Sequence, residues 1–208
     1  YYSLTSLKNL LERNGLEVVD VKLRDINGGS IRTYIRKKGN PNITPFKGAR
    51  ERLASLEEKE RQMELGTTRP YLDFAQRIDD LKKQMMLFIE SEKSKGKTCC
   101  ICGASTRGNT TLQYFGIDTR HVIAAAEANP DKWGKRTVGS MIPIVSVDEM
   151  KRINPSYQIV MIWHLFEGLM GKEKDYLKSG GKFILPLPEF KIIEYSKEFD
   201  RLMSTSFL

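Results

Sequence analysis

The sequence contains few of the residues that build metal sites or disulfide frameworks. It has three cysteines and two histidines among 208 residues. The cysteines, Cys99, Cys100 and Cys102, lie in one apolar run, where an extended chain turns Cys100 and Cys102 to one face and Cys99 to the other. Two such neighbours cannot complete a tetrahedral zinc site, and secreted frameworks space their cysteines differently. We expect no metal, and buried thiols in a core strand of a cytoplasmic protein.

Long hydrophobic runs are also missing. No stretch approaches the roughly 20 apolar residues that span a bilayer, which argues against a membrane protein. A content of 40% hydrophobic and 29% charged residues is typical of a folded globular protein, not of a disordered one. The chain begins with Tyr1 and shows no signal-peptide pattern. We therefore expect it to be a part of a longer protein.

The positive charge is unevenly distributed. The net charge is +8, and residues 1–39 contain eight Lys/Arg against four Asp/Glu, so half of the surplus lies in this segment. A basic hairpin edge is usually a solvated face that discourages edge pairing. Neither an RNP motif nor a zinc-finger or basic-zipper pattern accompanies it. Nucleic-acid binding through Arg32–Lys38 is therefore not favoured, and it would predict a steep loss of binding with salt.

Residues 1–39 predict a helix followed by a β-hairpin. Leucines recur at helical spacing until Asn14-Gly15 ends the helix. Apolar and charged residues then alternate over Val19–Leu23 and again over Ile31–Ile35, on either side of a glycine-rich turn. This block offers too little apolar surface to fold alone. We interpret it as the end of a domain whose body lies outside this chain.

Residues 40–97 predict a helical connector. A turn-rich break at 39–41 comes first, and a charged helix is expected over 48–65. Pro70 suits the first turn of a second helix, in which apolar residues recur every three or four positions as far as Phe88. This apolar stripe indicates helix packing and not a ligand site.

Residues 98–208 predict an α/β domain. The expected strands are Thr98–Cys102, Val122–Ala126, Met141–Ile144, Gln158–Ile162 and Lys182–Leu185, with a further edge strand at Ile192–Tyr195. Helices are expected near 109–115, 147–153 and 167–178, the second behind the capping sequence Ser146-Val147-Asp148-Glu149. Strands that alternate with short helices favour right-handed crossovers and a parallel sheet. We expect a Rossmann-like, doubly wound parallel sheet, preceded by the long helical segment and the helix–hairpin.

The loop at 103–110, Gly-Ala-Ser-Thr-Arg-Gly-Asn-Thr, is the first candidate site. It follows a strand and opens a helix, where backbone N–H groups and the helix dipole favour an anion. Donors are added by Ser105, Thr106, Arg107 and Asn109. The loop has neither the Lys-Ser/Thr of a Walker loop nor the spacing of G-x-G-x-x-G. A glycine loop of this kind alone is as often structural, but together with the other donor-rich loops on this rim it predicts a phosphate-bearing ligand without naming it.

A second loop, after the next strand, adds further candidates. Glu127 ends that strand, where doubly wound nucleotide sites often place a carboxylate on a ribose hydroxyl. Lys132 and Arg136 are candidate phosphate contacts, and Trp133 is a candidate base-stacking residue. Each of these also has a purely structural interpretation. Two histidines complete the set: His164 ends the fourth strand on the same rim, whereas His121, on the opposite rim, is expected to be structural.

Several motifs resemble, in order, the carboxy-terminal domain of the S-adenosylmethionine-dependent sugar C-methyltransferase family. They are 103–110, Leu112, Tyr114 and Gly116, Glu127 with Asn129-Pro130 and Lys132, Gly139 before Ile142-Pro143-Ile144, Trp163, and Gly180-Gly181-Lys182. Tyr71 to Ile78 is similar to the helix that precedes this domain. Tyr2-Ser3-Leu4 to Arg32 resembles the end of the methyltransferase domain. The similarity covers nearly the whole chain.

The resemblance implies that the full-length protein uses S-adenosylmethionine to methylate a carbon of a nucleotide-linked deoxyketosugar. The catalytic Glu-His pair, the methyl-donor loop and the zinc cysteines of the family would precede Tyr1, so we expect this fragment to be inactive alone, without bound cofactor. The expected partners are a nucleotide-diphosphate sugar and the upstream methyltransferase domain. The alternative is a stand-alone Rossmann-like nucleotide-binding module with a regulatory or interaction role.

The resemblance also suggests where individual residues would lie. Ser105, Thr106, Arg107 and Asn109 would be near the diphosphate. Asn27 and Ser30 would lie at the rim of the methyltransferase domain, although many relatives carry His where Asn27 stands. His164 stands where Asn is common, which favours hydrogen bonding over proton transfer.

Overall fold

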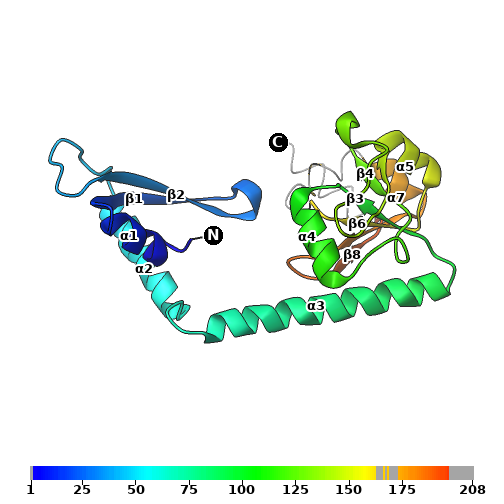
Figure 1. Ribbon diagram of the computed structural model, residues 1–208, viewed down its shortest axis with the longest axis horizontal. Helices are drawn as coiled ribbons and strands as arrows, with labels where there is room; N and C mark the ends of the chain where they lie inside the picture. Colours follow the sequence, from blue (N-terminus) through cyan, green and yellow to red (C-terminus); the bar gives the residue numbers. More distant parts are fainter. Residues whose placement is uncertain (1, 163–165, 167, 169–172, 197–208) are drawn as a thin grey trace. The chain divides into compact units, whose positions relative to one another are not determined.

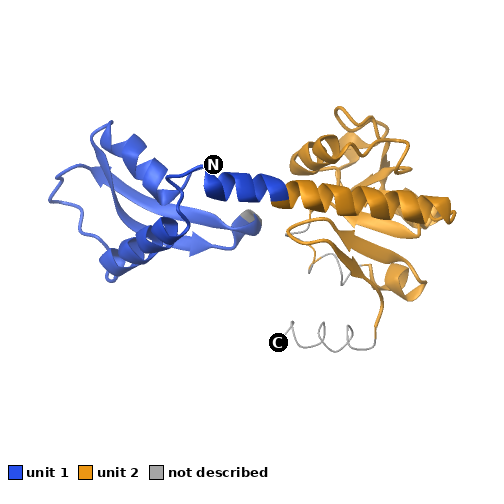
Figure 2. Ribbon diagram, turned by 90° about the horizontal axis from the view of Figure 1, so that it is seen from below, with its two compact units in different colours: residues 1–76 blue, residues 77–208 orange. Residues whose placement is uncertain are grey.

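The structure is a computed structural model that describes residues 2–162, 166, 168 and 173–196. The chain divides into two compact units, which we call unit 1 (Tyr1–Gln76) and unit 2 (Arg77–Leu208), coloured separately in Figure 2. The boundary falls inside one continuous helix, α3 (Arg69–Ser94), which was predicted to begin around Pro70. Each unit has a buried apolar cluster of its own.

Unit 1 is a β-hairpin packed against helices. Its elements are α1 (Leu4–Glu12), β1 (Leu16–Arg24), the 3₁₀ turn η1 (Ile26–Gly28), β2 (Ser30–Lys37) and α2 (Ala49–Gln62). The two strands pair antiparallel from Leu16 opposite Lys37 to Arg24 opposite Ser30, with a bulge between Val18 and Asp20. This arrangement confirms the helix–strand–turn–strand order expected from the alternating sequence pattern.

Polar contacts supplement a small apolar core in unit 1. The buried cluster consists of Leu4, Val21 and Leu56. The fully buried carboxylate of Asp20 accepts two hydrogen bonds from Arg52, at 2.7 and 2.8 Å. The α1 helix begins where Glu60 of α2 accepts hydrogen bonds from the first backbone amides of the helix.

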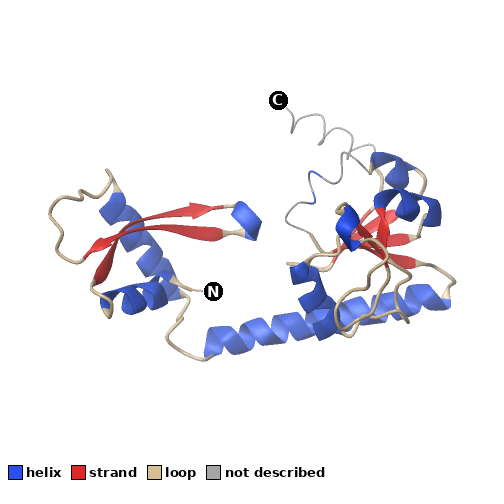
Figure 3. Ribbon diagram, turned by 45° about the horizontal axis from the view of Figure 1, so that its top comes forward, coloured by secondary structure: helices blue, strands red, loops and turns tan. Residues whose placement is uncertain are grey.

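Unit 2 contains a six-stranded, mostly parallel sheet (Figures 1 and 3). Its strands are β3 (Cys99–Cys102), β4 (Ala125–Glu127), β5 (Ile144–Ser146), β6 (Tyr157–Val160), β7 (Lys182–Leu185) and β8 (Lys191–Ile193). They lie in the order β5-β4-β3-β6-β7-β8, and only β8 is antiparallel to its neighbour. Every residue of β3 and β6 is buried, as expected for the centre of a sheet covered on both faces.

Apolar residues of the helices cover both faces of this sheet. One face carries Met85 and Ile89 of α3 and residues of α4 (Thr106–Phe115), in a cluster that includes Cys99. The other face carries α5 (Val147–Ile153) and α7 (Lys174–Lys178), whose clusters include Cys100 and Cys102. The three thiols are free and buried, and they alternate between the faces as predicted.

Several predicted boundaries were wrong. The second strand of the domain is Ala125–Glu127 instead of Val122–Ala126, and the fourth is Tyr157–Val160 instead of Gln158–Ile162. The third parallel strand begins at Ile144 instead of Met141, because Met141 has a positive φ of 57° and residues 137–142 close a turn. The first helix of the domain begins at Thr106 instead of 109, because Ser105 caps it. The edge strand is Lys191–Ile193 instead of Ile192–Tyr195. Of the helix expected over 167–178, residues 167 and 169–172 lie outside the described residues.

Candidate functional site

The carboxyl edge of the parallel sheet is where ligands bind in open α/β folds, at the point where the strand order reverses. Here that point lies between β3 and β6. From β3 the chain continues to β4 on one side of the sheet, and from β6 it continues to β7 on the other side. The loop that leaves β3 is Gly103–Ser105. A side chain at Gly103 would come within 2.9 Å of Ile162, and one at Gly108 within 2.8 Å of Met161. Both glycines therefore let the start of α4 approach the end of β6 closely.

A cavity of 340 Å³ opens at this edge. It is lined by the end of β3, the end of β4 and the first turns of α5, including Gly103, Ser105, Glu127, Lys132 and Met150. Its size is at the lower end of the range of small-molecule pockets. The walls are mainly apolar and a few charged groups converge on it, which is the usual composition of a ligand site.

The Glu127 carboxylate is the polar centre of the cavity wall. It forms an ion pair with Lys132 at 2.9 Å and also accepts a hydrogen bond from the backbone N–H of Asn129 at 3.1 Å. Burial opposes its ionisation, but these hydrogen bonds outweigh burial and lower the pKa of Glu127. Lys132 also donates to the backbone carbonyl of Ala104 at 3.0 Å. A single ammonium group thus joins the loops that follow β3 and β4.

The predicted donors at the start of α4 have different environments. The Ser105 hydroxyl accepts the Gly108 N–H at 3.0 Å and caps the helix. Thr106 and Arg107 are exposed in its first turn. Asn109 is half-buried, and its Oδ1 has no hydrogen-bond partner within the described part of the chain. Burying an amide oxygen without a partner is costly, so Asn109 has capacity for another group at this helix end.

Three residues that sequence analysis missed also line the cavity. They are Lys151 on α5, Gln158 on β6 and Glu173 just before α7. Burial raises the pKa of Glu173, and the charge of Lys151 offsets part of that effect. Burial, followed by the charges of Glu173 and Glu127, raises the pKa of Cys102 to about 12, so this thiol stays protonated near neutral pH. No motif marks these residues in the sequence; only the strand order brings them to this edge.

The structure brings together only part of the predicted set. Ser105, Glu127 and Lys132 line the same cavity. Asn27, in η1, and Ser30, the first residue of β2, belong to unit 1. His164 lies outside the described residues.

Two further residues that were considered as ligand contacts have local partners. The Trp133 indole donates to the Glu127 backbone carbonyl at 2.8 Å, and Arg136 donates to the Met141 carbonyl at 2.9 Å. Both contacts stabilise the segment that returns from β4 to β5.

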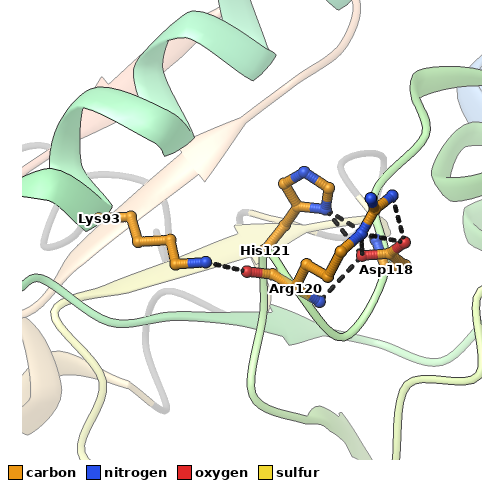
Figure 4. A network of polar contacts seen from close by, with 4 residues as sticks. All are labelled: Lys93, Asp118, Arg120 and His121. Carbon is orange, nitrogen blue, oxygen red and sulfur yellow. Dashed lines mark hydrogen bonds and ion pairs between the residues drawn. The ribbon is translucent and has the colours of Figure 1, made fainter.

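The other predicted histidine belongs to a local network at the start of β4 (Figure 4). Nδ1 of His121 lies 3.0 Å from a carboxylate oxygen of Asp118, which also accepts hydrogen bonds from Arg120. Lys93, at the end of α3, donates to the Arg120 backbone carbonyl at 2.6 Å. The Arg120 hydrogen bonds hold the pKa of Asp118 far below its usual range. The Lys93 hydrogen bond fastens the turn before β4 to α3, and the contact between His121 and Asp118 lies within that turn.

Metal clusters and membrane-spanning helices are both absent from the described residues. In that part of the chain, no group of three or more His, Cys, Asp or Glu side chains is placed to hold a metal ion. None of the described helices has the length and apolar character needed to cross a membrane.

Comparison with known proteins identifies the family. Residues 25–188 match the model of the C-methyltransferase C-terminal domain, which covers most of the chain. This chain belongs to that family. It is also 31% identical over 193 residues to the C-methyltransferase NovU of Streptomyces niveus, an alignment that covers 93% of this chain and 45% of the relative. The chain thus spans less than half the length of this curated relative.

Proposed function

We propose that this chain is the substrate-binding, carboxy-terminal part of an S-adenosylmethionine-dependent C-methyltransferase that acts on a nucleotide-linked deoxysugar. The nucleotide end of the substrate would occupy the cavity at the carboxyl edge of the sheet in unit 2. Its diphosphate would lie at the start of α4, near Ser105, Thr106, Arg107 and Asn109. Glu127 would accept a hydrogen bond from a ribose hydroxyl.

One observation carries this proposal: the cavity and the start of α4 lie side by side at the point where the strand order reverses. The N-terminus of a helix attracts phosphate through its free N–H groups and dipole. The partly apolar cavity beside it offers room for a nucleoside. The strand order resembles that of nucleotide-binding doubly wound sheets. Strands β3, β4 and β5 lie on one side of the switch point, and β6, β7 and β8 lie on the other. This order supports a Rossmann-like assignment for residues 98–208.

Unit 1 supports the second part of the proposal, in which residues 1–39 end a methyltransferase domain and residues 40–97 connect it to the substrate domain. Its apolar core is small, whereas Tyr2, Leu23 and Tyr71 are more than half exposed. They line a groove of 1180 Å³ within unit 1. Exposed apolar side chains that gather in one groove suit a face that another part of a protein covers. The upstream domain is the occupant that this proposal assigns to it.

The methyl donor is assigned to that upstream domain. S-adenosylmethionine would supply the methyl group, but its sulfonium is cationic, and the start of α4 combines the positive end of the helix dipole with the exposed Arg107. This helix start therefore fits a phosphate ester better than it fits the methyl donor. In this proposal the residues of the present chain bind and orient the sugar nucleotide, and proton abstraction falls to groups outside it.

Calorimetric titration with a nucleotide-diphosphate sugar tests the assignment, using this chain alone and the chain joined to its upstream domain. We expect saturable binding that Arg107→Ala weakens about tenfold, because a charge-assisted phosphate contact is lost. Arg50→Ala, an exposed arginine of α2 in unit 1, is the matched control and should leave the affinity unchanged. Absence of binding in both forms, or equal losses for the two variants, would contradict the proposal.

A further inference from the structure

The ammonium group of Lys132 has an unusual position at the proposed site. It comes from the short 3₁₀ turn η2 (Pro130–Lys132) and donates both to the Glu127 carboxylate and to the Ala104 carbonyl. Ala104 immediately precedes Ser105, the residue that caps α4. The Lys132 ammonium group therefore lies between the Glu127 carboxylate and the loop that leads into α4. An unpaired carboxylate in this place would repel any anion at the start of the helix.

The surroundings of the pair strengthen this electrostatic argument. The Glu127 side chain is only 14% exposed, so solvent screens its charge poorly. Its hydrogen bonds keep it ionised despite burial. A second carboxylate of the cavity, Glu173, has the positive charge of Lys151 near it. Glu127 would thus place a negative charge beside a proposed phosphate position unless a cation of its own compensates it. Among the described residues, Lys132 forms the ion pair with Glu127.

We propose that Lys132 is a positioning residue that acts through Glu127 and Ala104 and does not itself contact the phosphate. It neutralises the carboxylate at the end of β4 and fixes the carbonyl that precedes the helix cap. The two loops then present the N-terminus of α4 to an anion. This inference rests on the proposed function, because it requires a diphosphate to bind at this edge.

A double-variant experiment separates this role from direct phosphate binding. Pyrophosphate is the probe, because it has no ribose and so does not report contacts between Glu127 and a sugar. Lys132→Met should weaken pyrophosphate binding to the chain about tenfold. Adding Glu127→Gln should restore the affinity to within about threefold of wild type, because the uncompensated charge is gone. Glu127→Gln alone is the reference: a lysine that binds phosphate directly would lose as much affinity on Lys132→Met in this background as in wild type, whereas a positioning lysine would lose little.

Three controls make the result interpretable. Lys135→Met removes an exposed lysine of the same segment and should leave the affinity unchanged. Lys132→Arg keeps the charge and should retain affinity within about threefold. Circular dichroism spectra show whether Lys132→Met is folded. If it is not, Lys132→Arg is compared with the double variant Lys132→Arg/Glu127→Gln. The second change should then leave pyrophosphate affinity the same or higher.

The outcomes distinguish the inference from the proposal on which it rests. If the double variant binds pyrophosphate as weakly as Lys132→Met, or if Lys132→Met binds like wild type, the positioning role is overturned and the proposed site stands. If wild type binds neither pyrophosphate nor the nucleotide-diphosphate sugar, the proposed function is overturned together with the inference.

Discussion

The two units of this chain are stabilised in different ways. In unit 2, a central sheet is covered on both faces, and Phe183, Ile159 and Ile184 are completely buried. In unit 1, three buried apolar residues form the core, and the hairpin and helices are joined by a fully buried carboxylate and its arginine. Apolar burial provides most of the stability of ordinary domains. Apolar burial therefore dominates the stability of unit 2, whereas a buried ion pair contributes a larger share of the stability of unit 1.

The two units also differ in the residues that line their cavities. The groups that converge on the cavity of unit 2 lie at strand ends and helix starts, which are held by the packed sheet. A rigid scaffold that positions polar groups at one edge is the usual basis for a binding site. A groove of unit 1 instead combines polar residues with the exposed apolar side chains Tyr2, Leu23 and Tyr71, which suit coverage by another protein segment.

The largest expected effect comes from removing a core side chain of unit 2. Phe183 is fully buried and packs edge-to-face against both Phe166 and Tyr176. Phe183→Ala should lower the free energy of unfolding of unit 2 by about 4 kcal/mol. Both tryptophans of the sequence, Trp133 and Trp163, lie in unit 2, so tryptophan fluorescence in urea follows this unit alone.

The comparison predicts that Phe183→Ala does not change the stability of unit 1. Far-UV circular dichroism should retain an unfolding step of unit 1 with an unchanged midpoint in Phe183→Ala. If the steps of both units moved together, the units would be one cooperative structure and the comparison would fail.

The next largest effect is the pH dependence of the stability of unit 1. The hydrogen bonds from Arg52 lower the pKa of Asp20 below its ordinary value of 3.8. The contribution of this pair to stability is therefore fully present above that value and is lost as the pH falls through the lower folded pKa. Urea midpoints of unit 1 should decrease on acidification to about pH 2. Asp20→Asn should lower the midpoint at neutral pH and flatten this dependence; an unchanged pH profile would show that the pair does not stabilise unit 1.

The smallest effect compares two helix caps within unit 2. Ser105 caps α4 and Ser146 caps α5 through the same side-chain-to-amide hydrogen bond. Either serine changed to alanine should cost about 1 kcal/mol of stability. Only Ser105→Ala should also weaken pyrophosphate binding, because this cap lies beside the loop after β3. Equal affinity in both variants would remove Ser105 from the site.

Much of the fold follows from sequence pattern. Alternation predicted the hairpin, the apolar runs predicted the parallel strands, and the capping serine at 146 predicted α5. The predicted strand boundaries were wrong where a local backbone conformation limits the strand, as the positive φ of Met141 does. The Glu60 carboxylate at the start of α1 was also missed, because its partners lie 55 and 56 residues away in the sequence.

The candidate site was less accessible to sequence analysis. The glycine loop and Glu127 were identified because a strand end and a helix start have recognisable patterns. Sequence could not indicate that Lys132 would contact Glu127 and Ala104, since side-chain direction in a short turn depends on tertiary packing. Glu173 was missed for a similar reason: only the crossover from β6 to β7 brings it to the cavity.

The central claim is that the carboxyl edge of the sheet in unit 2 binds the diphosphate of a sugar nucleotide. Backbone amide chemical shifts of the chain, measured by NMR during titration with a nucleotide-diphosphate sugar, test it most directly. The account predicts saturable shifts concentrated at Gly103–Asn109 and around Glu127, with the turn at Asp118–His121 and the hairpin of unit 1 unaffected. Shifts confined to the hairpin or to Asp118–His121 would contradict it.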